Sequence, residues 1–173
     1  MALVFITGST DGLGFAAAQS LLAEGHQVVL HARSADRAAA VKELASRSGG
    51  VVVGDLRSAA ETRSIADQIN GIGRMDAIIH NAGVYSQRSR DTTPEGHAST
   101  LAINTLAPYM LTALIQRPGR LVYLSSGLHA AEKDRWVTLT GQSGHGIRHG
   151  PTPRASCTSL PWLSRWRGAG RRS

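Results

Sequence analysis

As far as Ser126, two kinds of segment alternate along the chain, and they differ in how their apolar and polar residues are arranged. Short apolar runs, bounded by glycine or polar residues, predict strands that are buried on both faces. Longer segments with apolar residues at helical spacing follow the runs and predict helices. We expect strands at about residues 2–7, 27–31, 50–54, 76–79 and 120–124, and helices at about residues 15–23, 34–46, 58–69 and 97–115.

Strands that alternate with helices on short loops predict an α/β fold with a doubly wound, Rossmann-type parallel sheet. In such folds ligands bind at the carboxyl ends of the strands. After Ser126 the alternation stops, and residues 137–173 show neither helical nor strand periodicity. We therefore expect a sheet that is incomplete at its C-terminal strands.

The distribution of charged residues along the chain also changes near this point. The formal net charge is +7, and seven of the 19 basic residues are arginines within residues 135–173, which contain no acidic residue. Residues 1–134 therefore carry 12 basic and 12 acidic side chains. This break predicts a folded domain of the Rossmann type over residues 1–134 and a basic tail of low order over residues 135–173.

Composition also excludes several classes of protein. The single cysteine, Cys157, rules out an internal disulfide and is typical of a reducing compartment. No apolar run approaches the roughly 20 residues of a membrane helix, and the first strand begins at Ala2, before any room for a signal peptide. The histidines show no ligand-like spacing. We expect a cytoplasmic protein without a metal site or a membrane partner.

Three glycines, Gly8, Gly12 and Gly14, lie in the stretch T-G-S-T-D-G-L-G, between the first strand and the first helix. A glycine-rich turn at this place presents backbone N–H groups and the positive end of a helix to a phosphate. The first glycine permits the sharp turn, the second lets a pyrophosphate approach, and the third lets helix and strand pack closely. A tight turn without a ligand is the alternative.

The spacing T-G-x-x-x-G-x-G resembles the cofactor loop of the short-chain dehydrogenase/reductase family. Further segments match that family in order: Asp55-Leu56 after the third strand, Asn81-Ala82-Gly83 after the fourth, Asn104 in the long helix, and Ser125-Ser126 after the fifth strand. The resemblance covers about residues 2–130. It implies a nicotinamide dinucleotide oxidoreductase whose cofactor-binding residues are Gly8, Ser9, Thr10, Gly12, Leu13, Gly14, Arg33, Asp55, Leu56, Asn81, Ala82 and Gly83.

The end of the second strand favours NADP(H) over NAD. An acidic residue there would hydrogen-bond a ribose 2′-hydroxyl and repel a 2′-phosphate, but this chain has Ala32 followed by Arg33. A guanidinium can bind the phosphate with two parallel hydrogen bonds. Asp11, in the glycine loop, counts against this choice, and Arg33 as an ordinary solvated arginine is the alternative.

The resemblance also implies the catalytic groups. Ser126 would hold the oxygen of a small carbonyl or alcohol substrate, and Asn104 would support a water-mediated proton path. In the family a tyrosine transfers the proton, and a lysine four residues later lowers the pKa of that tyrosine. Relatives often pair through two long helices, of which this sequence predicts only one, so a homo-oligomer is left open.

The sequence departs from the family in its C-terminal third. Its tyrosines are Tyr85, Tyr109 and Tyr123, and its lysines are Lys42 and Lys133, so no Tyr-x-x-x-Lys pair follows the catalytic serine. The helix that would carry this pair is absent too. As written, the chain lacks its proton donor, and we expect it to be inactive.

The basic tail suggests a cause. When residues 149–158 are back-translated and read from the third base of each codon, the permitted residues include Arg-Ala-Tyr-Ser-x-Ser-Lys-Leu-His, which contains the missing pair. We therefore hypothesise a single-base shift between about Trp136 and His145. A naturally divergent tail and a genuine basic appendage are the alternatives.

Three functions follow from these observations. The first is an NADP-dependent short-chain oxidoreductase that is truncated or frameshifted. The second is a non-catalytic dinucleotide-binding protein or gene remnant with the same half of the fold. The third is a nucleic-acid-binding module that uses the arginine tail, which the neutral body and the absence of a nucleic-acid-binding motif make the weakest. The substrate cannot be read from this sequence.

Overall fold

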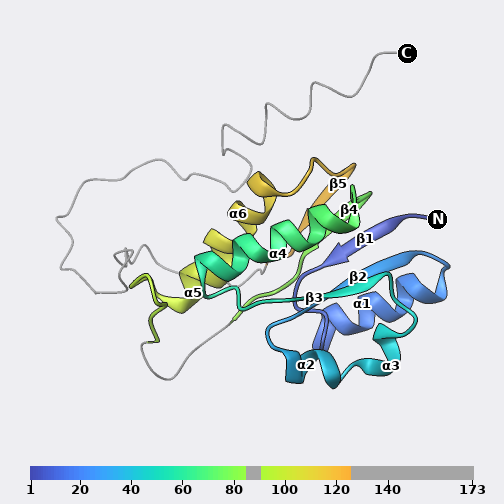
Figure 1. Ribbon diagram of the computed structural model, residues 1–173, viewed down its shortest axis with the longest axis horizontal. Coiled ribbons are helices and arrows are strands. Elements are labelled where there is room, and N and C mark those ends of the chain that lie inside the picture. Colours follow the sequence, from blue (N-terminus) through green and yellow to red (C-terminus); the bar gives the residue numbers. More distant parts are fainter. Residues whose placement is uncertain (85–90, 126–173) are drawn as a thin grey trace, which may run out of the picture.

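The computed structural model describes residues 1–84 and 91–125 (Figure 1). The predicted catalytic Ser126, the boundary at residue 134 and the basic tail lie outside the described residues. The strands are β1 (Leu3–Ile6), β2 (Gln27–Ala32), β3 (Gly50–Val53), β4 (Ala77–His80) and β5 (Arg120–Tyr123). The helices are α1 (Gly12–Ala23), α2 (Ala35–Ala39), α3 (Lys42–Ala45), α4 (Ala59–Ile72), α5 (Ser99–Leu101), η1 (Ala102–Leu106) and α6 (Ala107–Leu114).

The strands form one parallel sheet in the order β3-β2-β1-β4-β5. β1 is the central strand, and the chain runs outward from it to β3 on one side and then to β5 on the other. This order confirms the predicted doubly wound, Rossmann-type sheet. It also places the reversal of strand order between β1 and β4, where folds of this kind bind ligands.

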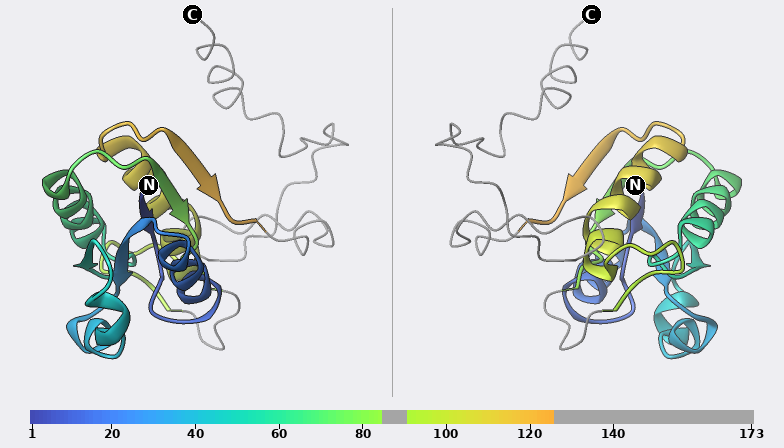
Figure 2. Two further views of the ribbon diagram at one scale, coloured as in Figure 1. Left: turned by 90° about the vertical axis from the view of Figure 1, so that its right-hand side faces the viewer. Right: turned by 90° about the vertical axis from the view of Figure 1, so that its left-hand side faces the viewer.

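Helices cover both faces of the sheet (Figures 1 and 2). On one face α4 and α6 lie side by side, and their buried residues Ile65, Ile69 and Leu111 pack on Phe5 and Ile78. On the other face Ala18 of α1, together with Val41 and Leu44, packs on the alternate residues of β1 and β2. The continuous apolar runs of the central strands are therefore buried on both sides, as the sequence pattern predicts.

The helix predicted over residues 34–46 is wrong in its continuity. Ser34 does cap its start, since its hydroxyl accepts the Arg37 N–H at 3.4 Å, but the helix is divided into α2 and α3. Val41 lies between them with φ −111° and ψ 26°, outside the helical region. This turn buries both Val41 and Leu44 against the sheet, so packing of the apolar side chains overrides local helix propensity.

The long helix predicted over residues 97–115 contains a π-helical segment, η1, between α5 and α6. Pro108 has no backbone N–H and cannot donate to the carbonyl of residue 104, so the α-helical ladder is interrupted at this point. π-Helical segments of one turn are frequent at functional sites. Asn104 lies within this one.

β5 is the strand at the edge of the described sheet, and part of its surface is open. Val122 is 36% exposed, and Leu124, which directly follows the strand, is 49% exposed. None of the helices in the described part of the chain is long and apolar enough to cross a membrane.

Candidate functional site

A cavity of about 840 Å³ lies at the carboxyl ends of the strands, where the glycine loop and the segments after β2, β3 and β4 meet. It is the place that the strand order predicts for a ligand. Its lining residues are Gly8, Thr10, Asp11, Gly12, Leu13, His31, Arg33, Ser34, Arg37, Asp55, Leu56, Arg57, Asn81, Ala82, Gly83, Val84, Ile103 and Leu124.

The glycine loop joins β1 to α1 and has two residues in the left-handed region. Gly8 has φ +64° and Gly12 has φ +55°, conformations that other residues rarely adopt. If Gly12 had a Cβ, no heavy atom would lie within 4 Å of it, apart from the adjacent residues and the backbone of the helix itself. The backbone at the start of α1 therefore faces open space, in the cavity, where a ligand could approach it closely.

Thr7 and Asn81 join this loop to the segment after β4. The Thr7 hydroxyl accepts hydrogen bonds from the N–H groups of Asn81 and Ala82, both at 3.0 Å. In return the Asn81 side-chain amide donates to the carbonyl oxygens of Thr7 at 3.0 Å and Gly8 at 3.1 Å. The two motifs that the sequence analysis singled out therefore form one hydrogen-bonded unit.

Two residues of the loop lie beneath it rather than in the cavity. Gly14 is buried, and a Cβ there would overlap the Gly8 carbonyl oxygen and the side-chain amide of Asn81. Ser9 is fully buried; its hydroxyl donates to the Ile6 carbonyl at 3.0 Å and accepts the His31 N–H at 2.8 Å. Both residues shape the loop and neither lines the cavity.

The end of β2 provides basic groups. Arg33 lines the cavity and is exposed, and among the described residues it has no carboxylate partner. Arg37, on α2, also lines the cavity and forms an ion pair with Asp11 of the glycine loop. Asp11 is thus neutralised by a neighbour, and the guanidinium of Arg33 is free to bind an anion.

The long helix contributes Asn104, whose side chain is paired with a backbone segment. Its carboxamide oxygen accepts the Val84 N–H at 2.9 Å, and its amide donates to the Val84 carbonyl at 2.9 Å. This fixes the helix against the segment that follows Gly83. Asn104 itself does not line the cavity, although Val84 and Ile103 do.

A sequence model of the family described as short chain dehydrogenase matches residues 2–136. The chain belongs to the short-chain dehydrogenase family. An uncharacterised oxidoreductase of Emericella nidulans is 44% identical over 149 residues, which are 84% of this chain and 58% of that protein. The short-chain dehydrogenase chyC of Penicillium rubens is 47% identical over 133 residues, or 77% of this chain and 51% of that protein.

The fold comparison agrees with the family. A short-chain dehydrogenase from Sphingobium yanoikuyae in complex with NADPH has a TM-score of 0.62 and 27% identity, over 76% of this chain and 56% of that one. The chain therefore spans about half the length of the curated relatives it matches.

Most of the residues that the resemblance implied for a short-chain dehydrogenase are brought together. Of the predicted cofactor-binding residues, those that line the cavity are Gly8, Thr10, Gly12, Leu13, Arg33, Asp55, Leu56, Asn81, Ala82 and Gly83. Ser9 and Gly14 lie under the loop, and Ser126 lies outside the described residues. Other residues that line the cavity were not predicted from the sequence, among them His31, Arg37 and Arg57.

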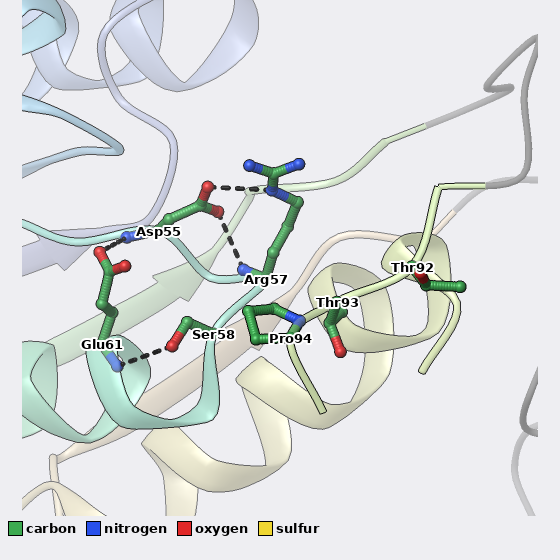
Figure 3. A pocket seen from close by; sticks show the side chains of 7 residues that line it. All are labelled: Asp55, Arg57, Ser58, Glu61, Thr92, Thr93 and Pro94. Atoms are coloured by element: carbon green, nitrogen blue, oxygen red, sulfur yellow. Dashed lines mark hydrogen bonds and ion pairs between the residues drawn. The ribbon is translucent and has the colours of Figure 1, made fainter. Parts of the chain in front are cut away.

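Asp55, one of the predicted cofactor-binding residues, already has partners. Its carboxylate accepts the Arg57 backbone N–H and the Arg57 Nε–H, both at 2.9 Å (Figure 3). These contacts raise the pKa of the Arg57 guanidinium. Glu61 accepts the Asp55 N–H at 2.7 Å, so the turn after β3 is held on both sides.

Arg57 and Asp55 also line a second cavity, of about 380 Å³, together with Ser58, Glu61 and Thr92–Pro94 (Figure 3). The loop that contains Thr92–Pro94 is attached at two points. Arg57 reaches Asp91 at 3.1 Å, and Glu95 accepts the Ala59 N–H at 2.8 Å, at the start of α4. The hydrogen bond from the Ala59 N–H, followed by that from the Thr93 side chain, lowers the pKa of Glu95.

In residues 1–84 and 91–125 there is no group of three or more histidine, cysteine, aspartate or glutamate side chains placed to hold a metal ion.

Proposed function

We propose that this chain carries the dinucleotide-binding part of an NADP(H)-dependent oxidoreductase, which transfers hydride between the cofactor and a small carbonyl or alcohol. The cavity that joins the glycine loop to Arg33 is the observation that supports this proposal. It combines open backbone at a helix start with a free guanidinium, which are the two features that a phosphorylated dinucleotide requires.

The residues present fit such a ligand. At Gly12 a ligand can approach the backbone closely, because the space that a Cβ would fill is open. The N–H groups at the start of α1 and the positive end of that helix, a 12-residue element, would bind the pyrophosphate. Asp55 and Leu56 line the cavity after β3, and Asn81, Ala82 and Gly83 line it after β4, so a bound cofactor would border both segments.

Arg33 would bind the 2′-phosphate, which makes NADP(H) the proposed cofactor rather than NAD(H). Asp11 counted against this choice in the sequence, but its ion pair with Arg37 removes much of its negative field from the cavity. Arg37 also lines the cavity and adds positive charge close to Arg33. The Sphingobium yanoikuyae neighbour in complex with NADPH adds support.

The nicotinamide, when bound, supplies or accepts the hydride, and the protein supplies position and the proton. Ser126 would hold the substrate oxygen, and Asn104 would fix the helix that borders the reacting centre through its two hydrogen bonds to Val84. The proton donor of the family has no counterpart in this sequence, since no Tyr-x-x-x-Lys pair follows Ser126. The chain as written would therefore bind the cofactor without turning over.

We propose that a single-base shift between about Trp136 and His145 put the rest of the chain in a wrong reading frame, which would explain both the arginine-rich tail and the missing pair. A non-catalytic dinucleotide-binding protein is the second candidate, and the same absence of the Tyr-x-x-x-Lys pair favours it. A cytoplasmic location stays a prediction, and self-association stays open.

Calorimetric titration of the full chain with NADP⁺ and NAD⁺ tests cofactor binding. We expect NADP⁺ to bind more tightly, and Arg33→Ala to weaken NADP⁺ by roughly 10- to 100-fold through loss of a charge-assisted contact, with little effect on NAD⁺. Arg63→Ala is the matched control, because Arg63 is an exposed arginine on α4 that does not line the cavity. Equal affinities for both dinucleotides in the wild type would refute the NADP preference.

Resequencing the DNA across codons 130–173 separates the two candidates. A lost or gained base whose correction restores Tyr-x-x-x-Lys supports the oxidoreductase, and the corrected protein should then oxidise NADPH with a carbonyl substrate. DNA that encodes the tail as written supports the non-catalytic protein.

A further inference from the structure

His31 is the last but one residue of β2, and its side chain is 3% exposed. Its ring lies between two backbone groups from different parts of the chain. Nδ1 accepts the Gly8 N–H at 2.9 Å, and Nε2 lies 2.9 Å from the Gly54 carbonyl oxygen. A carbonyl can only accept and an N–H can only donate, so these contacts require a neutral ring with its proton on Nε2.

The backbone of His31 is bonded to the same loop. Its N–H donates to the Ser9 hydroxyl at 2.8 Å, and its carbonyl accepts the Ser9 N–H at 3.3 Å. His31 therefore continues the pairing of β1 with β2 into the glycine loop, and its ring extends the connection to the residue after β3. A dinucleotide bound in the cavity would lie across these three strand ends.

We propose that His31 is the positioning residue of the glycine loop, and that only its neutral ring holds the loop in the conformation that binds the dinucleotide. The inference rests on the proposed function. His31 lines the cavity, but its ring nitrogens are committed to the protein, so it acts on a ligand through Gly8.

Protonation would reverse one of the two contacts. An imidazolium carries a hydrogen on both nitrogens, so Nδ1–H would face the Gly8 N–H, donor against donor. The Gly8 N–H would lose its acceptor and leave the position that gives the loop its turn at φ +64°. The loop would then present its N–H groups in a different arrangement, and the affinity for pyrophosphate would fall.

The surroundings of the ring favour the neutral form at pH 7. Burial lowers the pKa of His31, and this outweighs the Gly54 carbonyl and the charge of Asp55, both of which raise it. Asp55, after β3, is the charged group that acts on the ring. From β1 the ring of Phe5 lies nearly perpendicular to that of His31, and from the loop the uncharged Gly8 amide meets it. An unfolded histidine takes up its proton near pH 6.5, whereas folded His31 does so only at lower pH. The contribution of His31 to the free energy of unfolding is therefore fully present above pH 6.5 and is lost as the pH falls below it.

NAD⁺ is the probe for the test, because the 2′-phosphate of NADP⁺ itself titrates near pH 6, at about the second pKa of a phosphate monoester. Binding of NAD⁺ to the full chain is measured from pH 8 to pH 5, with circular dichroism to verify the fold at each pH. We expect the wild-type dissociation constant to rise about threefold or more over this range. His31→Asn keeps an acceptor near Nδ1 and cannot titrate, so its affinity should stay nearly constant.

His31→Gln completes the set, since its longer amide reaches toward the Gly54 carbonyl without offering Gly8 an acceptor; it should bind NAD⁺ weakly at every pH. Hydrogen exchange of residues 7–14 without any ligand gives a second readout. In the wild type, protection of these amides should fall between pH 7.5 and pH 5 beyond the intrinsic effect of pH, and in His31→Asn it should not.

The outcomes separate the two proposals. Parallel pH curves for the wild type and His31→Asn, or equal loop protection in both, would overturn the role of His31 while the proposed function stands. If the folded wild type binds neither NAD⁺ nor NADP⁺ at pH 8, the proposed function fails and this inference fails with it.

Discussion

Asn81→Asp is the sharpest test of the joint between the glycine loop and β4, because it replaces one NH₂ group by an oxygen. Nδ2 of Asn81 donates to the carbonyl oxygens of Thr7 and Gly8. A carboxylate would lose both hydrogen bonds and face two acceptors. Two lost bonds, with the acceptors left unpaired, should lower the free energy of unfolding by about 2–4 kcal/mol at pH 7. This corresponds to a fall in Tm of roughly 6–12 °C.

The effect should depend on pH with a defined sign. The two carbonyl oxygens favour the protonated acid, so the folded pKa of the introduced carboxyl group would lie above its unfolded value of about 3.9. The destabilisation should therefore be smallest below about pH 4, where the acid can donate one hydrogen bond, and grow as the pH rises through the folded pKa.

Urea unfolding followed by circular dichroism measures both quantities. Asn70→Asp is the matched control, because the Asn70 amide donates to one carbonyl, that of Leu114, while its oxygen accepts the Gln116 N–H. It loses one bond and keeps the other, so about 1 kcal/mol is expected. A free energy of unfolding for Asn81→Asp within about 0.5 kcal/mol of that of the wild type, which is the range of ordinary surface substitutions, would contradict the role given to the two hydrogen bonds.

Three further predictions concern the glycine loop, the end of β4 and the start of α4. Gly14→Ala should greatly reduce dinucleotide binding and soluble yield, because its Cβ would overlap neighbouring atoms. Gly71→Ala is the control: its Cβ meets open space in α4, so it should raise the free energy of unfolding by about 0.5–1 kcal/mol. Equal behaviour of the two variants would contradict the packing at Gly14. His80 stacks on Tyr123, and burial lowers its pKa to about 4. Between pH 6.5 and pH 4 the wild type should therefore lose about 3 kcal/mol of its free energy of unfolding in urea, and His80→Phe should not lose this amount. An unchanged pH profile in the variant would contradict the prediction. Glu95→Ala should speed hydrogen exchange of the Ala59 amide, the first of α4, because it removes the acceptor of that amide; unchanged exchange would contradict the contact.

The sequence alone predicted the sheet and the location of the cavity, because both depend on local patterns. Apolar runs gave the strands, and the glycine loop and the segment Asn81-Ala82-Gly83 each follow a strand, so a parallel sheet must bring them to one edge. The cap at Ser34 was predicted from its residue type and is confirmed. The division at Val41 was missed, since it depends on which side chains the sheet buries.

The parts of the cavity that escaped prediction depend on register between distant strands. Arg37 meets Asp11 only because α2 packs beside the glycine loop, and nothing in either local segment indicates this ion pair. His31 reads as one more residue of a buried strand, and only the register of β2 against β3 places its ring against Gly54. Ser126, which the resemblance made catalytic, lies outside the described residues and stays a prediction.

The order of the strands also determines when the chain can complete its fold during synthesis. β1 leaves the ribosome first but lies at the centre of the sheet, between β2 and β4. Its first neighbour ends at Ala32 and its second begins only at Ala77, an interval that translation at ordinary rates covers in roughly 2–10 s. Throughout that interval one edge of the most apolar strand is unpaired. A nascent chain of this kind would depend most on chaperones between these two residues, long before its functional site is complete.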